Sequence, residues 1–297
     1  MIALSNPEKI ALLTDSTADL PAPMREGKPI YVVPLKIRCE DGEYSDGVDI
    51  TAEGDITAEG VYERLHRGEL PRTSLPEGGV VSDTLDQIRA DGYERVIAVM
   101  LSSGLSGTYN MVRLQAGQRD DLEIAVFDSR SGSLGIGIMV LQLWEEIVAG
   151  ASWETLVRER APHLVANTFP FFSVDTLEYL RRGGRIGRIT ALAGTMLSIK
   201  PIITFSDDGQ LQSIAKVRGR RQVQDKILEL LRARFQSGRR YNLAVANGGA
   251  PEEMAEFAAR LKAEFPNYEH FWEGVMDATL SVYIGDGVIG GGIQFLD

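Results

Sequence analysis

The sequence predicts an α/β protein whose first half forms a parallel sheet. Short apolar runs at 10–13, 96–101 and 123–127 each end in small polar residues and lead into segments with helical spacing. Buried strands that alternate with helices in this way are typical of parallel sheets. Two of the runs end in the same dipeptide, Asp15-Ser16 and Asp128-Ser129. Because ligands bind at the carboxyl ends of strands in doubly wound folds, we expect both dipeptides at a ligand-facing edge.

The other elements of the first half follow from local composition. In chain order we expect a strand over 31–37, a polar turn region over 40–49, a helix over 57–66, an irregular segment over 71–79, and helices over 80–90, 134–148 and 153–165. Pro34 places a bend or a sheet edge within the first of these. The segment 71–79 is too rich in proline and glycine for a helix or a strand.

After about residue 165 the pattern changes, and we expect a second α/β domain with a mixed sheet. Its predicted elements are a strand at 169–174, helices at 176–182 and 190–197, a hairpin of 201–205 with 211–217, a helix at 220–236, a strand at 241–246, a helix at 252–265, and strands near 270–274, 280–284 and 292–296. The Asp208-Gly209 pair suits the turn of the hairpin. The predicted domains are therefore 1–165 and 166–297.

Composition narrows the class of protein. The chain has 297 residues, is 44% hydrophobic and carries a net charge of −11, so we expect no binding to nucleic acid or anionic membranes. The single cysteine, Cys39, excludes an intrachain disulfide and suits a reducing compartment. Gln142 and Lys200 interrupt the most apolar stretches, and no basic segment precedes an apolar run at the N-terminus. We therefore expect a cytoplasmic protein without a membrane-spanning helix.

The sequence offers little support for catalysis by a metal or a cofactor. The three histidines, His66, His163 and His270, are scattered and lack the spacing of metal ligands. Neither a Walker loop nor a dinucleotide-binding glycine pattern is present. Residues 104–108 look superficially like the nucleophile elbow of a serine hydrolase, but Thr108 stands where the elbow needs glycine. We expect no cofactor, no metal and no enzyme activity.

The best candidate site is the turn that follows the strand at 96–101. Ser102 and Ser103 end this strand, glycines follow, and a helix then begins with unpaired backbone N–H groups. Thr73 and Ser74 supply two further hydroxyls on another loop. Together they could surround a carboxylate or phosphate, each neutral hydrogen bond contributing about 1 kcal/mol. The alternative is an ordinary serine cap at the start of a helix.

Arginines are concentrated around Gly183-Gly184. Arg181, Arg182 and Arg185 lie within five positions of one another in an acidic chain. They are either solvated charges at a helix C-terminus or a surface that recognises a phosphate or an acidic partner.

Five motifs stand in the order in which the DegV family has them. They are LTDST at 13–17, TS-x-P at 73–76, LSSGLSGTY at 101–109, DS-x-S at 128–131 and LEYLRRGGRI at 177–186. The chain thus resembles DegV proteins over nearly its whole length. The resemblance implies a two-domain α/β protein that binds a long-chain fatty acid such as palmitate without catalysis, as a carrier in lipid transport or fatty acid metabolism. Some members present the acid to a separate fatty acid kinase.

The resemblance also implies where the ligand lies. The acyl chain would run between the domains, and its carboxylate would meet Thr73 or Ser74 and Ser102 or Ser103. Burying about 14 methylenes would contribute on the order of 10 kcal/mol before opposing terms, so a neutral clamp would suffice.

The chain departs from the family pattern at two places. Leu75 and Glu77 replace polar residues after Thr73-Ser74, and the stretch around Gly285 lacks the family's His followed by Gly-Pro-Gly. The second departure bears on handling of the head group during phosphorylation. Two other functions stay open: a phosphotransferase acting on a small polar substrate such as a ketose, which requires a compact polar pocket, and a regulatory module switched by lipid.

Overall fold

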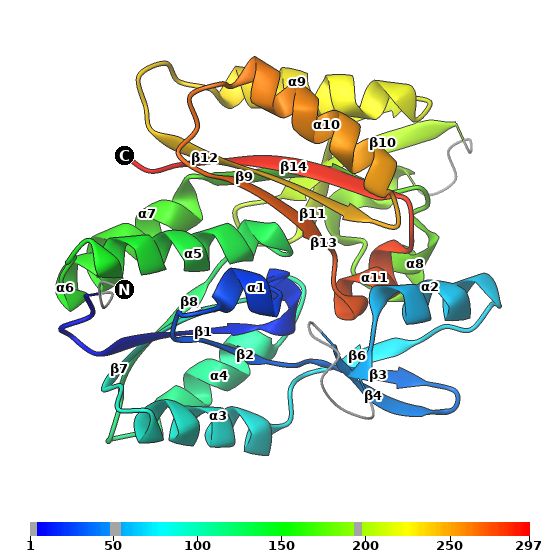
Figure 1. Ribbon diagram of the computed structural model, residues 1–297. Helices are drawn as coiled ribbons and strands as arrows, with labels where there is room; N and C mark the ends of the chain where they lie inside the picture. Colours follow the sequence, from blue (N-terminus) through cyan, green and yellow to red (C-terminus); the bar gives the residue numbers. More distant parts are fainter. Residues whose placement is uncertain (1–4, 48–54, 193–197) are drawn as a thin grey trace.

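Two β-sheets face each other across a layer of helices in the computed structural model, which describes residues 5–47, 55–192 and 198–297 (Figure 1). The first sheet has the order β2-β1-β7-β8 and is parallel throughout. Its strands are β1 (Ile10–Asp15), β2 (Ile30–Val33), β7 (Arg95–Met100) and β8 (Glu123–Asp128). The predicted α/β class and parallel sheet are confirmed, and Asp15 and Asp128 both end strands at the same edge.

Helices α3 (Gly78–Ala90) and α4 (Thr108–Ala116) cover the outer face of the parallel sheet (Figure 1). Alternate residues of the strands supply the two apolar faces, as period-two side-chain alternation requires. Leu13 packs in the cluster beneath α3 and α4, whereas Leu12 packs on the inner side.

The second sheet is mixed and has the order β11-β10-β9-β14-β12-β13. Its strands are β9 (Thr168–Ser173), β10 (Ile199–Phe205), β11 (Leu211–Arg218), β12 (Tyr241–Gly248), β13 (Phe271–Val275) and β14 (Val288–Phe295). Only β12 and β13 pair in parallel. Helices α9 (Arg221–Arg234) and α10 (Pro251–Glu264) cover its outer face (Figure 1). The predicted hairpin is confirmed, with Phe205 opposite Leu211.

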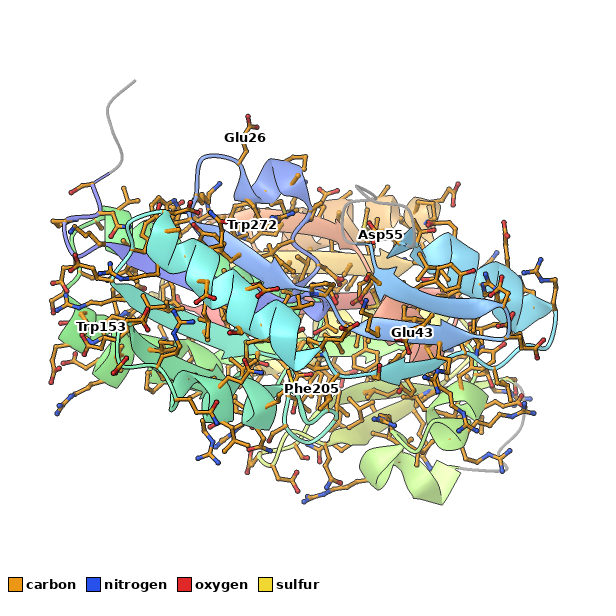
Figure 2. The ribbon with its side chains drawn as sticks, turned by 90° about the horizontal axis from the view of Figure 1, so that it is seen from below. Glu26, Glu43, Asp55, Trp153, Phe205 and Trp272 are labelled. Atoms are coloured by element: carbon orange, nitrogen blue, oxygen red, sulfur yellow. The ribbon has the colours of Figure 1, made fainter. Side chains whose placement is uncertain are left out.

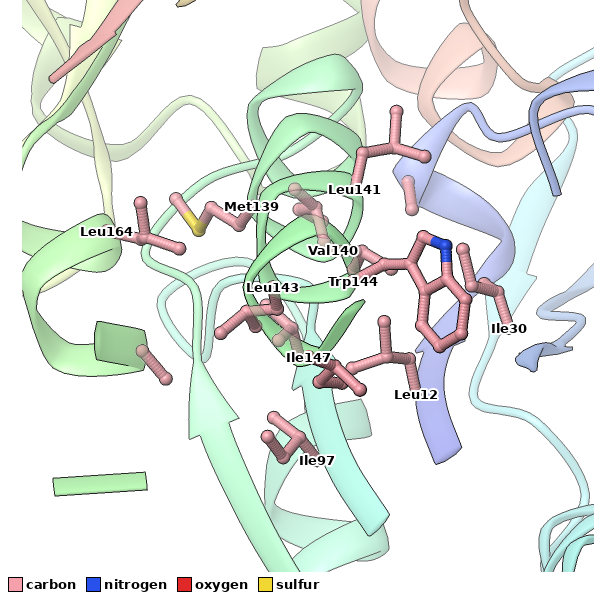
Figure 3. Packing of buried hydrophobic residues seen from close by; sticks show 14 of the residues in the cluster. Leu12, Ile30, Ile97, Met139, Val140, Leu141, Leu143, Trp144, Ile147 and Leu164 are labelled. Atoms are coloured by element: carbon pink, nitrogen blue, oxygen red, sulfur yellow. The ribbon is translucent and has the colours of Figure 1, made fainter. Parts of the chain in front are cut away.

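Helix α5 (Leu134–Val148) fills the space between the sheets. It contacts β1 and β7 on one side and β9, β12 and β13 on the other. Twelve of its fifteen residues are buried, as expected for a helix that is apolar on all sides. Figure 3 shows Leu143, Trp144 and Ile147 of this helix packed among Leu12 and Ile97 of the parallel sheet. The chain continues through α6 (Trp153–Thr155), a π-helical turn (Leu156–Arg160) and α7 (Ala161–Ala166).

The structure contains a third, small sheet with the order β5-β4-β3-β6, and two of its strands lie in segments for which we predicted no strand. It consists of β3 (Lys36–Cys39), β4 (Gly42–Asp46), β5 (Asp55–Ile56) and β6 (Arg72–Ser74). The predicted turn region 40–49 contains β4, and the segment 71–79 contains β6. Both are short strands that form because they pair with β3. Local composition does not reveal such pairing. Figure 2 shows Glu43 of this sheet and Trp153 toward opposite ends of the molecule.

The prediction of a strand at 280–284 is wrong. These residues belong to helix α11 (Ala278–Ile284), whose cap is Asp277. The helix packs between α2 (Ala58–His66) and α8 (Glu178–Arg182) instead of joining a sheet. Its apolar and β-branched composition is equally compatible with a strand, so tertiary packing decides.

Two further predictions have a limited outcome. The predicted helix at 190–197 falls mostly outside the described residues, and its first residues end a 3₁₀ helix, Gly187–Leu192. The strands of the parallel sheet all precede residue 165 and those of the mixed sheet all follow it, while the boundary itself stays a prediction.

Among the described residues, none of the helices has the length and apolar composition needed to cross a membrane.

Buried carboxylates hold the start of α11 against the first half of the chain. The backbone N–H of Asp277 donates to Asp19 at 2.8 Å, and the N–H groups of Ala278 and Thr279 donate to Asp46 at 3.1 and 3.3 Å. Desolvation by burial raises the pKa of both Asp19 and Asp277. At this junction between the first half and α11, Asp19 and Asp277 therefore hold protons more tightly in the folded state.

We expect this cluster to make the folded state less stable as pH rises. The unfolded chain releases the Asp19 proton near pH 4, whereas the folded pKa is raised to about 7. Between these values the folded protein binds more protons, so the free energy of unfolding falls as pH increases. Asp19→Asn should flatten this fall, measured by urea unfolding between about pH 5 and 8. Asp120→Asn, at an exposed position, is the control; equal slopes for the two variants would contradict the prediction.

Candidate ligand-binding site

An apolar pocket lies among α5, α11 and the inner face of the mixed sheet. Its cavity volume is about 110 Å³, so it is narrow. Its walls carry leucines and phenylalanines such as Leu101, Leu105, Leu134, Phe172 and Phe205. Glycines 290–292 on β14 and Ala244 and Ala246 on β12 leave room beside the sheet. The pocket is thus shaped for a slender apolar molecule.

One part of the wall is polar and joins the two halves of the chain. Thr73 on β6 and Tyr283 on α11 both line the pocket, and their hydroxyls are hydrogen-bonded at 2.5 Å. The guanidinium of Arg185 lies 4.9 Å from the centre of the Tyr283 ring. Arg185, Tyr283 and Thr73 therefore form one contiguous group, which we call the polar cluster.

Arg185 keeps an uncompensated positive charge at the pocket. Its Nε donates to the carbonyl of Leu105 at 3.2 Å and its Nη1 to the carbonyl of Gly183 at 2.8 Å. No carboxylate pairs with it among the described residues. A guanidinium that is held by carbonyls and an aromatic ring is well suited to bind an anion. Its partners are neutral, so they do not compensate its charge, and they fix its orientation.

The glycine pair before Arg185 allows this arrangement. A Cβ on Gly183 would lie 2.3 Å from Cδ1 of Tyr283, so the ring needs a glycine beneath it. Gly184 has φ +72°, a conformation that side chains disfavour, and it turns the chain from α8 toward Arg185. Packing against Tyr283 therefore explains Gly183, and the left-handed backbone conformation explains Gly184.

Thr279 is a pocket residue that the sequence did not reveal. It precedes Tyr283 by four positions on α11, so both lie on one helix face. Its side chain is 2% exposed, and its hydroxyl has no hydrogen-bond partner among the described residues. A buried hydroxyl without a partner is unusual and fits a site that a ligand completes. The capping pattern from Asp277 onward was the available signal for a helix here.

The structure brings only part of the predicted hydroxyl clamp to the pocket. Thr73 lines the pocket, but Ser74 is exposed on β6. Ser102 is buried and donates to the carbonyl of Gly209 at 2.7 Å, and the exposed Ser103 donates to Asp128 at 2.5 Å. These two hydroxyls would have to release their bonds to reach a carboxylate. Their contact with a ligand stays a prediction.

The predicted arginines also divide into two groups. Arg185 lines the pocket, whereas Arg181 and Arg182 are exposed on α8. Arg182 forms an ion pair with Glu178 one turn earlier. Such an exposed pair contributes little to stability. Arg181 and Arg182 can therefore contact another molecule at the surface.

The strand-end turn supports the pocket through close backbone contact. The Asp15 carboxylate accepts the N–H of Leu101 at 2.7 Å, and burial raises its pKa to about 6. Gly104 lies against the turn of the β10–β11 hairpin, where an added Cβ would be 2.5 Å from the carbonyl of Gly209. The turn thus holds the second half of the chain in place beside Leu101 and Leu105.

We expect Gly104→Ala to destabilise the fold by about 1–3 kcal/mol, because the backbone of Gly209 must shift. Gly79→Ala is the matched control: an added Cβ there meets nothing within 4 Å, and alanine favours helix α3. The free energy of unfolding in urea measures both. Equal stability of the two variants would show that the contact with Gly209 is unimportant.

One set of side chains has the composition of a metal site. The ligand atoms of Cys39, Asp41 and Glu69 lie within 4.8 Å of one another. Arg64 pairs with Asp41 at 2.9 Å and with Glu69 at 3.3 Å, which supplies their counter-charge. Burial raises the pKa of the Cys39 thiol to about 11, which disfavours the thiolate that metal binding needs. We therefore assign no metal to this group.

The fold and the pocket define an α/β protein with two facing sheets and, between them, an apolar cavity with a cationic polar cluster in its wall. The model of the DegV family, described as "Uncharacterised protein, DegV family", matches residues 9–295. The chain belongs to the DegV family.

Two curated relatives agree. The chain is 36% identical over 283 residues to a DegV domain-containing protein of Clostridium acetobutylicum, covering 95% of this chain and 98% of the relative. It is 30% identical to Protein DegV of Bacillus subtilis, covering 95% and 97%.

Solved structures show the same fold. A DegV family protein from Thermus thermophilus, described by its fatty acid binding, has a TM-score of 0.88 at 29% identity and covers 97% of this chain and 100% of its own. DegV from Bacillus subtilis, described as a fatty acid binding protein, has a TM-score of 0.84 at 30% identity, covering 97% and 99%.

Proposed function

We propose that the protein binds a long-chain fatty acid, such as palmitate, and serves as a non-catalytic carrier in lipid transport or fatty acid metabolism. The observation that carries this proposal is a narrow apolar pocket whose wall contains Arg185, a cation without a carboxylate partner in the part of the chain that the structure describes. A fatty acid has the same division into a long apolar chain and one anionic end. The fatty acid binding described for the Thermus thermophilus and Bacillus subtilis relatives supports the proposal.

The energetics favour a long chain. Each methylene that leaves water contributes about 0.8 kcal/mol, so about 14 of them supply on the order of 10 kcal/mol before the entropy of binding is subtracted. The polar contacts then need only to orient the ligand. A compact polar substrate gains little from such walls, so we do not propose the alternative of a ketose phosphotransferase.

The carboxylate in this proposal lies beside the polar cluster. Arg185 provides the charge, and the hydroxyls of Thr73 and Tyr283 can turn from each other to donate to the ligand. Thr279 adds a hydroxyl that has no partner within the described residues. Ser74, Ser102 and Ser103 of the predicted clamp would then act after a local rearrangement.

Presentation to a fatty acid kinase in the cytoplasm is the proposed context. Arg181 and Arg182 are exposed and lie on the same short helix segment that leads to Arg185. Positive charge there would suit an acidic partner surface close to the head group.

Mass spectrometry of the denatured, purified protein should release a long-chain fatty acid in roughly equal molar amount, because the pocket walls hold such a ligand through purification. Several preparations from different growth media should all contain one. Repeated release of no lipid, together with failure to take up added palmitate, would contradict the proposed function.

Arg185→Gln should weaken palmitate binding about 10- to 100-fold, since a hydrogen bond to a charged group contributes about 1.5–3 kcal/mol. Titration of delipidated protein with palmitate measures the change. Arg182→Gln is the matched control, because the same substitution three positions earlier falls outside the pocket lining. Equal losses in the two variants would remove Arg185 from the proposed head-group site.

A further inference from the structure

Helix α5 and strands β9, β12 and β14 line the pocket with mostly apolar residues. On each of these four elements, the next residue on the same face is polar at one end of the pocket. On α5, Leu134 and Ile138 line the pocket, and Gln142 follows at the same four-residue spacing. Gln142 is also the residue that interrupts the apolar run of this helix. The helix surface therefore changes from apolar to polar at one point along its length.

The strands repeat this change with period-two spacing. Ala246 and Ala244 line the pocket on β12, and Asn242 is the next residue on that face. On β14, Gly290 and Gly292 are followed by Gln294.

The same holds on β9, where Phe172, Pro170 and Thr168 share a face. The register aligns the polar positions, with Gln294 opposite both Asn242 and Thr168. All four elements thus turn polar at the same level.

Hydrogen bonds join these four residues into a continuous layer, which we call the amide wall. Nδ2 of Asn242 donates to Oε1 of Gln142 at 3.0 Å and to Oε1 of Gln294 at 3.1 Å. Nε2 of Gln294 donates to the hydroxyl of Thr168 at 3.1 Å, and Thr168 donates onward to the carbonyl of Leu164 at 2.8 Å. Their exposed fractions lie between 0% and 9%. A buried network in which the members satisfy one another is rigid, because opening it leaves polar groups without partners.

We propose that the amide wall ends the acyl site and sets the longest chain that the protein binds. This inference rests on the proposed function. The pocket extends along β9 from Phe172 to Thr168, which is five residues and, at four steps, about 13 Å of strand. The terminal methyl group of a bound acid meets the wall at Thr168. A longer chain would have to separate hydrogen-bonded amides, and the gain from burying one more methylene does not compensate for that loss.

A second, polar cleft begins on the other side of the wall. Gln142 lines this cleft as well, beside Glu146, Arg160 and His270, and its Nε2 donates to Oε1 of Glu146 at 3.2 Å. The cleft has a volume of about 710 Å³, far more than that of the apolar pocket. The amide wall therefore separates an apolar pocket from a polar space, and its removal would let a longer chain extend toward that space.

The test compares two variants that should move chain-length preference in opposite directions. Gln142→Ala combined with Asn242→Ala removes the centre of the wall, and Ala244→Leu fills the pocket just before it. Delipidated proteins are offered a mixture of saturated acids of about 12 to 22 carbons, and bound acids are quantified by mass spectrometry; each additional buried methylene should change affinity roughly fourfold. We expect the double variant to favour acids longer than those favoured by the unmodified protein, and Ala244→Leu to favour shorter ones.

Gln224→Ala is the control. Gln224 is a buried amide on α9, bonded to the carbonyl of Glu253 on the outer side of the mixed sheet, and its loss should leave the preference unchanged. An unaltered preference in both test variants, with binding retained, would overturn the inference while leaving the proposed function intact. If the unmodified protein binds none of the acids, the proposed function fails and the inference fails with it. Should the double variant not fold, the expected shift of Ala244→Leu toward shorter acids still decides the question.

Discussion

The structure depends on one helix that is shared by two sheets. Helix α5 is apolar on nearly all sides, so neither sheet alone could bury it. The parallel sheet takes one side and the mixed sheet takes the other. Gly137 permits the close approach, since a Cβ there would lie 2.5 Å from the carbonyl of Ala18. The apolar pocket lies where this shared helix and the mixed sheet do not touch, because Gly290, Gly292 and Ala244 have too little side chain to fill the space.

The polar side of the pocket comes from segments that are far apart in the chain. Thr73 belongs to the small sheet, Arg185 to the turn after α8 and Tyr283 to α11. Helix α11 unites them because Asp19 and Asp46, from the first half of the chain, accept the N–H groups at its start. The same buried carboxylates that fasten this helix thus position Thr279 and Tyr283 in the pocket wall.

Polar groups bound the pocket at two places with different character. The polar cluster has an unpaired cation and a hydroxyl without a partner among the described residues, so it is prepared for a charged ligand atom. The polar groups of the amide wall are hydrogen-bonded to one another, so they provide no hydrogen bonds for a ligand and only block its path. A pocket that is receptive on one side and closed on the other gives an amphipathic ligand a single orientation.

The sequence by itself determined the α/β class, the parallel pairing of the first half and the hairpin around Gly209. It also singled out the pair Thr73-Ser74 and Arg185 as candidate site residues, without deciding between the two hydroxyls or placing Arg185 at the pocket. These follow from periodicity, turn chemistry and motifs, which are local properties of the chain. It could not determine that residues 280–284 form a helix, that Tyr283 and Thr279 face the pocket, or that Ser102 bonds to Gly209. Short apolar segments suit a helix and a strand equally, and a hydroxyl binds whichever acceptor the fold brings near. Only tertiary packing decides such questions, because the contacting residues are separated by a hundred or more positions in the chain.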